Sequence, residues 1–375
     1  MAIINFNRLL AMADKEARQL RRDRRSLVLA FLLPVMLLVI FGYAISWDVR
    51  DIRTVVLDND NSRHSRALLD AFRASGYFIL RRNLSNYKEI DTRFDGVNTQ
   101  LAIVIPADFS EKLNTGKPAE VQAIVDGSDA NTATIILSYT RAITQSYALD
   151  TLLRGREAHQ PVRLESRVWY NEELLSKNMI VPGLVAVIMM IVAAMLTSLT
   201  IAREWERGTM EQLAATPVSR TEVVIGKLLP YLAIGLMDVV VSSMLGVWIF
   251  DVPFQGNVLL FMVMSTFFLI GALGLGFIIS AVGRSQLMAT QVAMIITFLP
   301  AFLLSGFMYS ISVMPQPLQS FTYLIPARYF IVVTRGIFLK GVGPEALWVQ
   351  GTLMIIFAAI GLLFSIKAFK KELRA

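Results

Sequence analysis

Six stretches of about 20 mostly apolar residues constrain this chain more than any other feature of its sequence. They cover Leu27–Trp47, Met179–Ala202, Leu228–Phe250, Asn257–Val282, Leu287–Ser305 and Leu347–Ile366. A helix needs about 20 apolar residues to cross the roughly 30 Å hydrocarbon core of a bilayer. The sequence therefore predicts an α-helical membrane protein with six transmembrane helices. A soluble enzyme is not expected, because only 17% of the 375 residues are charged, against about 25% in ordinary soluble domains.

The first stretch has a second interpretation, as a cleaved signal peptide. Its apolar residues end at Ala44-Ile45-Ser46, a small-x-small pattern that also precedes signal-peptide cleavage sites. However, 26 residues precede the stretch and three of them are acidic. We therefore expect an uncleaved membrane helix over residues 27–47.

Basic residues near the ends of these stretches predict the orientation of the chain. Lys and Arg are most frequent in residues 1–26, in 203–227, at Arg284 and in the tail 367–375. The connections of the opposite side contain fewer, with none in 251–256 and three in 306–346. Because Lys and Arg near helix ends stay in the cytoplasm, we expect both termini to be cytoplasmic. This distribution also explains the net charge of +7 without a nucleic-acid partner.

Residues 48–178 separate the first two stretches and are long enough to fold as an α/β domain outside the cell membrane. The segment holds 17 basic and 18 acidic residues, a balance typical of a folded, solvated domain. Short apolar runs that resemble strands alternate with helical patterns. The expected strands are Thr54–Leu57, Tyr77–Leu80, Leu101–Ile105, Val121–Val125 and Val162–Tyr170, and the expected helices are Ser62–Ser75, one starting near Pro106–Asp108, and Thr132–Leu153.

The first 26 residues predict an amphipathic helix. Its apolar face is expected to contain Phe6, Leu9, Leu10, Ala13, Ala17 and Leu20. Such a helix, with basic residues on its other side, can lie among the lipid headgroups of an anionic leaflet. Packing against a protein partner explains the same pattern nearly as well.

The cytoplasmic connection 203–227 predicts one short helix with defined ends. Thr209-x-x-Gln212 has the pattern of a capping box, and Thr216-Pro217 ends a helix over Met210–Ala215, because proline disfavours helix at the preceding residue. Ser219-x-x-Glu222 is a second capping box, which starts the next helix. Six residues are too few for a stable isolated helix. The helix is therefore expected to pack against another protein at the cytoplasmic face.

Several kinds of chemistry find no support in the sequence. Cysteine is absent and there are only two histidines, so no zinc site, cluster or thiolate nucleophile is expected. No G-x-x-x-x-G-K-[ST] loop is present. Asp58, Asp60, Asp126 and Asp129 lie beside Asn, Ser and Gly, and we interpret them as turn formers rather than metal ligands. The chain is thus predicted not to be an enzyme, and to contain no metal or cofactor.

Asp238 is the one acid predicted to lie inside a membrane helix. Ionisable groups at that depth are functional candidates, so Asp238 is a weak candidate for a residue of the substrate path. Two alternatives stay open: it can hydrogen-bond Ser242 or Ser243 in helix packing, or it can face a second copy of the chain.

The connection 203–227 resembles the corresponding segment of membrane subunits of ATP-binding-cassette (ABC) exporters, in the type-2 permease superfamily. Members have an acidic segment followed by Gly-Thr-x-Glu-x-Leu, Thr-Pro and Ser-Arg. This chain has Glu204, Glu206, Gly208, Thr209, Glu211, Leu213, Thr216, Pro217, Ser219 and Arg220 at these positions. The order of parts along the chain is also similar, including an external re-entrant segment over 306–346 that contains Ser305-Gly306-Phe307, Met314-Pro315, Pro326–Phe330 and Arg335–Phe338.

The resemblance implies a permease subunit that a separate ATPase drives. Residues 203–222 would form the coupling helix region, and the residues implied in coupling are Glu204, Glu206, Arg207, Gly208, Thr209, Met210, Glu211, Leu213, Thr216, Pro217 and Arg220. ATP and magnesium would be bound by the ATPase. Two permeases, as a homodimer or heterodimer in a bacterial inner membrane, would export a drug, a small amphiphile or an envelope component, with a periplasmic adaptor as a further partner.

Two other functions fit a chain with six membrane helices. An ion-driven secondary transporter is expected to have several buried ionisable residues or internal repeats, and we find one such acid and no clear halves. A membrane-anchored sensor or secretion component would use the external domain to bind a ligand. Ion flux through the purified chain alone, in liposomes, would favour the first of these over the ABC exporter.

Overall fold

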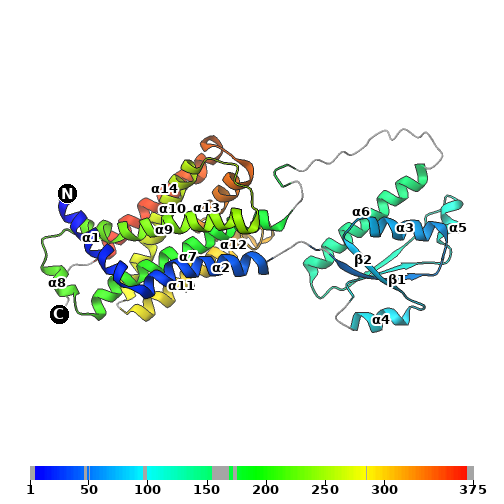
Figure 1. The fold of residues 1–375 in the computed structure, drawn as a ribbon, viewed down its shortest axis with the longest axis horizontal. Coiled ribbons are helices and arrows are strands. Elements are labelled where there is room, and N and C mark those ends of the chain that lie inside the picture. Colours follow the sequence, from blue (N-terminus) through cyan, green and yellow to red (C-terminus); the bar gives the residue numbers. More distant parts are fainter. Residues whose placement is uncertain are drawn as a thin grey trace. The chain divides into compact units, whose positions relative to one another are not determined.

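The computed structural model describes residues 5–45, 49, 51–95, 99–153, 169–171, 175–283 and 285–369. Its contacts divide the chain into two compact units, one formed by Met1–Ser46 with Arg167–Ala375 and the other by Trp47–Ser166. Figure 1 shows that the first unit is helical and that the second contains a sheet. Several predicted features lie outside the described residues: most of the strand Val162–Tyr170, the end of the first stretch at Trp47, and the charges at Arg284, Lys370, Lys371 and Arg374.

The helical unit confirms the prediction of a multi-pass membrane protein. Among the described residues, five helices are long and apolar enough to cross a bilayer: α7 (Ser176–Glu206), α9 (Arg220–Phe250), α10 (Val258–Gly283), α11 (Gln286–Leu303) and α14 (Pro344–Ala368). The helix α2 (Arg24–Ala44) adds a shorter apolar stretch over Ala30–Ala44. Each of these helices overlaps one of the six predicted stretches.

The helix α7 is the centre of this unit. It packs against α2, α9, α10, α11 and the short helix α13 (Pro326–Arg335). Nearly every residue from Ile180 to Glu204 is buried. A helix that is apolar all round is expected in such a central position. The close packing of α7 on α10 depends on Gly276, where a Cβ atom would lie 2.3 Å from the carbonyl oxygen of Ala194.

The segment before the last helix is broken rather than continuous. It contains a 3-10 turn η1 (Ile311–Val313), α12 (Gln316–Thr322), α13 and a π-helical turn η2 (Gly336–Lys340). The pair formed by Gln316–Thr322 and Pro326–Lys340 is bent by 77°, as in a broken span or a re-entrant loop. Pro326 occupies the first turn of α13, where its missing N–H is tolerated. This is the segment in which the sequence predicts a re-entrant arrangement.

The second unit is built on a four-stranded sheet with the order β2-β1-β3-β4. Strand β1 (Ile52–Asp58) pairs in parallel with β2 (Phe78–Asn83) and β3 (Leu101–Ile105), and β4 (Gln122–Val125) is antiparallel to β3. The helices of the unit are α3 (Arg63–Ala74), α4 (Lys88–Asp95), α5 (Phe109–Asn114) and α6 (Ala130–Leu153). Every residue of β3 is buried, as expected for a central parallel strand covered on both faces.

Local signals explain where the first helix of this unit begins. Ser62 is the N-cap of α3, and its hydroxyl accepts hydrogen bonds from the N–H groups of His64 and Ser65. Leu68, Leu69 and Phe72 of α3 then pack on the sheet in one core cluster. The strand β3 has the bounds expected from the sequence, and β1, β2, β4, α3 and α6 overlap their expected ranges. The side of the membrane on which this unit lies stays a prediction.

Candidate functional site

The short helix between the first two long helices of the bundle is α8 (Met210–Ala215), with the bounds that the sequence predicts. Gly208 precedes it with a φ of +69°, a conformation that glycine adopts without strain. Thr216 follows it in extended conformation, as expected for a residue before proline. The helix boundaries therefore follow from local sequence alone.

The two faces of α8 differ in polarity. Met210 and Leu213 are buried against the rest of the helical unit, whereas Glu211 and Gln212 are exposed. Of the other predicted coupling residues, Glu206, Arg207, Gly208, Pro217 and Arg220 are also exposed. The helix is thus fixed to its own chain by two apolar side chains and offers a polar surface outward.

The prediction that Thr209 caps α8 is wrong. Its side chain makes no capping hydrogen bond. Instead, the Thr209 hydroxyl donates to a carboxylate oxygen of Glu204, in the last turn of α7. A hydrogen bond to a charged carboxylate is stronger than a neutral one, and donating to Glu204 orients the Thr209 side chain toward α7 instead of toward the N–H groups of α8.

The second predicted capping box is confirmed and has an additional partner. The Ser219 N–H donates to Oε2 of Glu222 over 2.7 Å, and the Ser219 hydroxyl accepts from the N–H of Glu222. The other carboxylate oxygen of Glu222 accepts from the backbone N–H of Asn5 over 2.7 Å. The start of α9 is therefore also bonded to the start of α1 (Phe6–Arg22).

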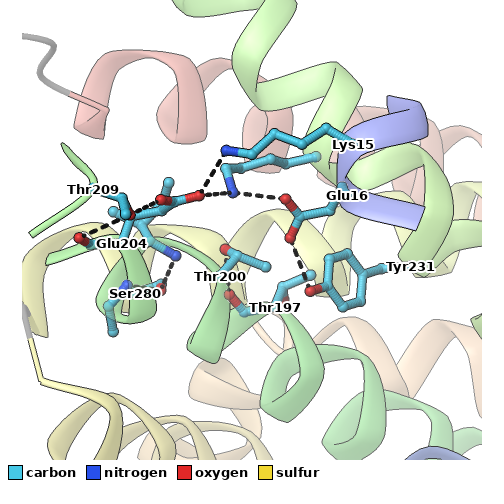
Figure 2. A network of polar contacts seen from close by, with 11 residues as sticks. Lys15, Glu16, Thr197, Thr200, Glu204, Thr209, Tyr231 and Ser280 are labelled. Carbon is cyan, nitrogen blue, oxygen red and sulfur yellow. Dashed lines mark hydrogen bonds and ion pairs between the residues drawn. The ribbon is translucent and has the colours of Figure 1, made fainter. Parts of the chain in front are cut away.

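The main feature of this region is a buried group of charges from α1, α7 and α9, shown in Figure 2. The Lys227 ammonium lies 2.8 Å from Oε2 of Glu16 and 3.1 Å from Oε1 of Glu204. Tyr231 donates its hydroxyl to the other oxygen of Glu16 over 3.1 Å, and the Lys15 ammonium lies 3.4 Å from Glu204. We call these five residues the Lys227 cluster.

Lys227, Glu16 and Glu204 of this cluster are almost completely removed from solvent, whereas the side chain of Lys15 is 51% exposed. The exposed fractions of the side chains are 1% for Lys227, 3% for Glu16 and 6% for Glu204. Each buried charge loses several kcal/mol of solvation, which only close partners can offset. Here each carboxylate has a cation and a hydroxyl as partners, since Glu204 also accepts from Thr209. The arrangement therefore joins α1, the end of α7 and the start of α9 through bonds that are costly to break separately.

Glu206 makes a different connection, at the surface. Its carboxylate accepts hydrogen bonds from the backbone N–H of Gln286, over 2.7 Å, and from the side-chain amide of the same residue. These bonds connect the end of α7 to the start of α11. Glu204 and Glu206 are thus both bound within the chain, one inside and one at the surface, and Glu211 is the predicted coupling acid that points outward.

The structure corrects the predicted face of α1. Leu9 and Leu20 are buried as expected, but Met12 and Glu16 complete the buried stripe, and 67% of Phe6 and 46% of Leu10 are exposed. This stripe packs on α9, where a Cβ atom at Gly226 would lie 2.8 Å from Cβ of Met12. The partner of α1 is therefore a helix of the same chain.

Sequence reasoning missed the members of the Lys227 cluster other than Glu204. Lys15 and Lys227 appeared only as positive charges at the ends of membrane stretches. The available signal was Glu16, which stands four residues after Met12 and four before Leu20, so it interrupts an apolar stripe at helical spacing. A charge at such a position indicates a buried partner, although it does not indicate which residue that partner is.

Asp238 lies in the middle of α9 and is 1% exposed. The alternative in which Asp238 hydrogen-bonds Ser242 or Ser243 is not observed: Oδ2 of Asp238 and both hydroxyls have no hydrogen-bond partner among the residues that the structure describes. This part of α9 therefore holds three buried polar groups that no other described residue satisfies. In the same described ranges, no group of three or more His, Asp or Glu residues could hold a metal ion.

Comparisons with known proteins agree over nearly the whole chain. A family model described as an ABC-2 family transporter protein matches residues 24–367. The probable multidrug ABC transporter permease YbhS of Escherichia coli K12 is 36% identical over 360 residues, which cover 96% of this chain and 95% of the relative. The probable multidrug ABC transporter permease YbhR of the same organism is 31% identical over 357 residues, which cover 95% of this chain and 96% of the relative. The inner membrane transport permease YhhJ is 27% identical over 81% of both chains.

Proposed function

The chain belongs to the ABC-2 transporter family as a permease subunit of an ABC exporter, and we propose that α8 and the Lys227 cluster connect it to the ATPase of that exporter. The observation that carries this proposal is the position of α8. It is a short helix that follows α7 and precedes α9 in the chain, buries Met210 and Leu213, and has an exposed polar surface.

The proposed orientation places α1, α8 and the C-terminus in the cytoplasm of a bacterial cell, with the chain in the inner membrane. Basic residues before α2 and around α8 support it, since Lys and Arg near helix ends stay on the cytoplasmic side. In this orientation the α/β unit, which follows α2 directly, lies outside the cytoplasm. A relative named as an inner membrane transport permease agrees with this location.

The proposed docking surface for the ATPase comprises the exposed residues around α8: Arg207, Glu211, Gln212, Pro217 and Arg220. The ATPase subunit would bind and hydrolyse ATP with magnesium, and the chain described here would contribute no residue to that reaction. Its task is mechanical. If the ATPase displaces α8, the membrane helices move as well, because side chains and backbone connect α8 to them.

The Lys227 cluster supplies this connection. Thr209 directly precedes α8 and is bonded to Glu204 of α7, and Glu204 is paired with Lys227 of α9. Because Lys227 also pairs with Glu16, α1 moves with the other two helices. Coupling requires elements whose arrangement both sites can change, and the ends of α7 and α9 are such elements, with Pro230 of α9 only three residues from Lys227.

The proposed cargo and assembly rest on the family and on the names of two relatives. Two permeases and two ATPases are proposed to form the working unit, with an adaptor as a further partner outside the membrane. Two relatives are named as probable multidrug permeases, so a drug or another small amphiphile is the proposed cargo. The unsatisfied polar groups of α9 at Asp238, Ser242 and Ser243 are the proposed polar contacts of its path.

A single charge reversal tests the docking surface. The tagged chain is isolated from membranes of its own cells, and co-purifying ATP hydrolysis is measured with and without cargo. Glu211→Lys is expected to lose the ATPase, or at least its stimulation, while the amount of chain inserted in the membrane is unchanged. Glu345→Lys is the matched control, since Glu345 is also an exposed acid in a first helical turn. Unchanged stimulation in Glu211→Lys would refute the docking role.

A further inference from the structure

A cavity of about 690 Å³ lies between the C-terminal half of α1 and the end of α7. Its lining is strongly cationic. Five basic side chains, Lys15, Arg18, Arg22, Arg203 and Arg207, face two carboxylates, Asp14 and Asp23. Three positive charges are therefore in excess, and the proposed coupling function gives no role to Arg18 or Arg22.

Ion pairs within the chain account for three of these five cations. Arg203 lies 2.9 Å from Asp23, Lys15 lies 3.4 Å from Glu204, and Arg18 pairs with Asp14. Arg22 and Arg207 have no ion-pair partner in the part of the chain that the structure describes. Both are exposed. The excess charge thus comes mainly from two guanidinium groups, one on each side of the cavity.

The cavity lies where the hydrocarbon core of the membrane ends. Arg203 is the first charged residue after the apolar stretch of α7, which ends at Ala202, and Asp23 directly precedes α2. Their ion pair therefore connects the end of α7 to the residue between α1 and α2, where the sequence predicts the edge of the bilayer. Lipid phosphates occupy the same layer.

We propose that this cavity binds the phosphate group of an anionic phospholipid, with Arg22 and Arg207 as its two cationic contacts. Guanidinium groups bind phosphate oxygens through paired hydrogen bonds. Basic pockets between membrane helices on the cytoplasmic side are suited to anionic headgroups. The volume exceeds that of a lone phosphate ion and lies in the range of small-molecule sites, so a glycerol headgroup also fits.

Such a lipid would hold the two walls of the cavity together. One wall is α1 and the other is the end of α7, and both also contribute to the Lys227 cluster through Glu16 and Glu204. The headgroup would therefore stabilise the position of α1 relative to the end of α7, the helix that precedes α8. Placing it in the cytoplasmic leaflet rests on the proposed orientation of the chain, whereas the binding itself does not depend on the ATPase.

Binding is tested on the full chain, purified in neutral detergent without its ATPase, by native mass spectrometry with dioctanoylphosphatidylglycerol. Arg22→Gln and Arg207→Gln are each expected to weaken binding about fivefold, and the double variant about 30-fold, from the attraction of one cation to an anionic lipid. Arg21→Gln is the matched control. It removes the same charge from the same turn of α1, and Arg21 does not line the cavity.

Four results would overturn the proposal. Equal binding of dioctanoylphosphatidylcholine would show that the site does not select anionic lipid. An equal loss in Arg21→Gln would show a diffuse surface charge instead of a site. Displacement by inorganic phosphate at the same concentration as the lipid would indicate a site for free phosphate. Unchanged lipid binding in the double variant would show that Arg22 and Arg207 do not contact the phosphate.

Discussion

The Lys227 ammonium and the Glu16 carboxylate lie 2.8 Å apart, although 211 positions separate them in the sequence. This ion pair fastens the N-terminal helix α1 to the start of α9. Glu204 shares the same lysine and belongs to the last turn of α7. One ammonium group thus connects three helices next to the short helix that is proposed to receive the ATPase.

Replacing Lys227 is expected to reduce the stability of the chain strongly. Lys227→Met leaves Glu16 and Glu204 buried without their shared cation, and breaking a buried pair in this way costs about 3–5 kcal/mol of unfolding free energy. Thermal unfolding in detergent measures the loss. The triple variant Glu16→Gln, Glu204→Gln, Lys227→Met removes all three charges together, and most of the stability is expected to return. A triple variant as unstable as the single one would mean that packing volume, and not charge, explains the loss.

Substitutions of Thr209 and Ser219 are expected to have different effects on stability and on ATP hydrolysis, although both residues occupy predicted capping positions. Ser219→Ala removes a true cap and is expected to cost about 1 kcal/mol of stability. Thr209→Val removes the bond to Glu204 and is expected to reduce cargo-stimulated ATP hydrolysis more than stability, with recovery in Thr209→Ser. Calorimetry and hydrolysis assays on the assembled exporter measure both. Equal stability losses with unchanged stimulation would contradict this assignment.

Gly226 determines how closely α1 approaches α9. A Cβ atom there would lie 2.8 Å from Met12 Cβ and 3.1 Å from the carbonyl oxygen of Leu9. Gly226→Val is therefore expected to destabilise the chain by about 1–3 kcal/mol through overpacking and to expose α1 to proteolysis. Met12→Ala in the same chain should relieve part of the clash, because it removes Met12 Cγ, which would lie 3.0 Å from the added Cβ atom, although Met12 Cβ remains. Protease resistance equal to that of the unchanged protein would show that α1 does not depend on this contact.

Asp238 is expected to affect cationic cargo. As the pH rises the carboxyl group loses its proton, so export of a cationic drug should increase with pH in the unchanged protein. Asp238→Asn cannot ionise, and its export rate should then be independent of pH. Transport into inside-out vesicles over a pH series measures this, with a neutral drug as the reference cargo. Parallel pH profiles for the two proteins would assign Asp238 to packing.

The environment of Asp60 predicts that the local stability of the α/β unit depends on pH. Burial raises the pKa of the Asp60 carboxyl, but hydrogen bonds donated by Ser62 and Ser110 outweigh it and hold the pKa below its usual value. A carboxyl whose pKa is lower in the folded state stabilises the fold above the unfolded pKa of about 4, and this contribution disappears as the pH falls through the folded value. The protection of the α5 amides against hydrogen exchange, relative to their intrinsic rates at each pH, should therefore fall below about pH 4 in the full chain.

The control for this effect is Asp60→Asn, which keeps an acceptor oxygen for Ser110 but does not titrate. Its exchange in α5 should change less with pH than that of the unchanged chain. Asp126 serves as a comparison, because hydrogen bonds from Ser128 also lower its pKa, but it is exposed and far from α5 in sequence. If Asp126→Asn removes the pH dependence of α5 and Asp60→Asn does not, the assignment to Asp60 is wrong.

The features that the sequence determined by itself are those set by local physics. A run of about 20 apolar residues has one stable environment, so the membrane helices could be found from composition along the chain. Gly208 permits the left-handed backbone conformation before α8, and Pro217 disfavours helix at Thr216, so these two residues set the ends of α8 to within a residue. The capping box at Ser219 involves residues only three positions apart and was predictable for the same reason.

Only the tertiary structure decided which distant groups meet. Thr209 and Gln212 match a capping pattern, yet the hydroxyl of Thr209 bonds to Glu204 because a buried carboxylate lies within its reach. Lys227 and Glu16 are an ordinary basic and an ordinary acidic residue in the sequence, and their pairing follows from the packing of α1 on α9. Choice among many possible partners depends on distance and burial, which are properties of the folded chain, whereas helix ends and membrane spans depend on neighbouring residues alone.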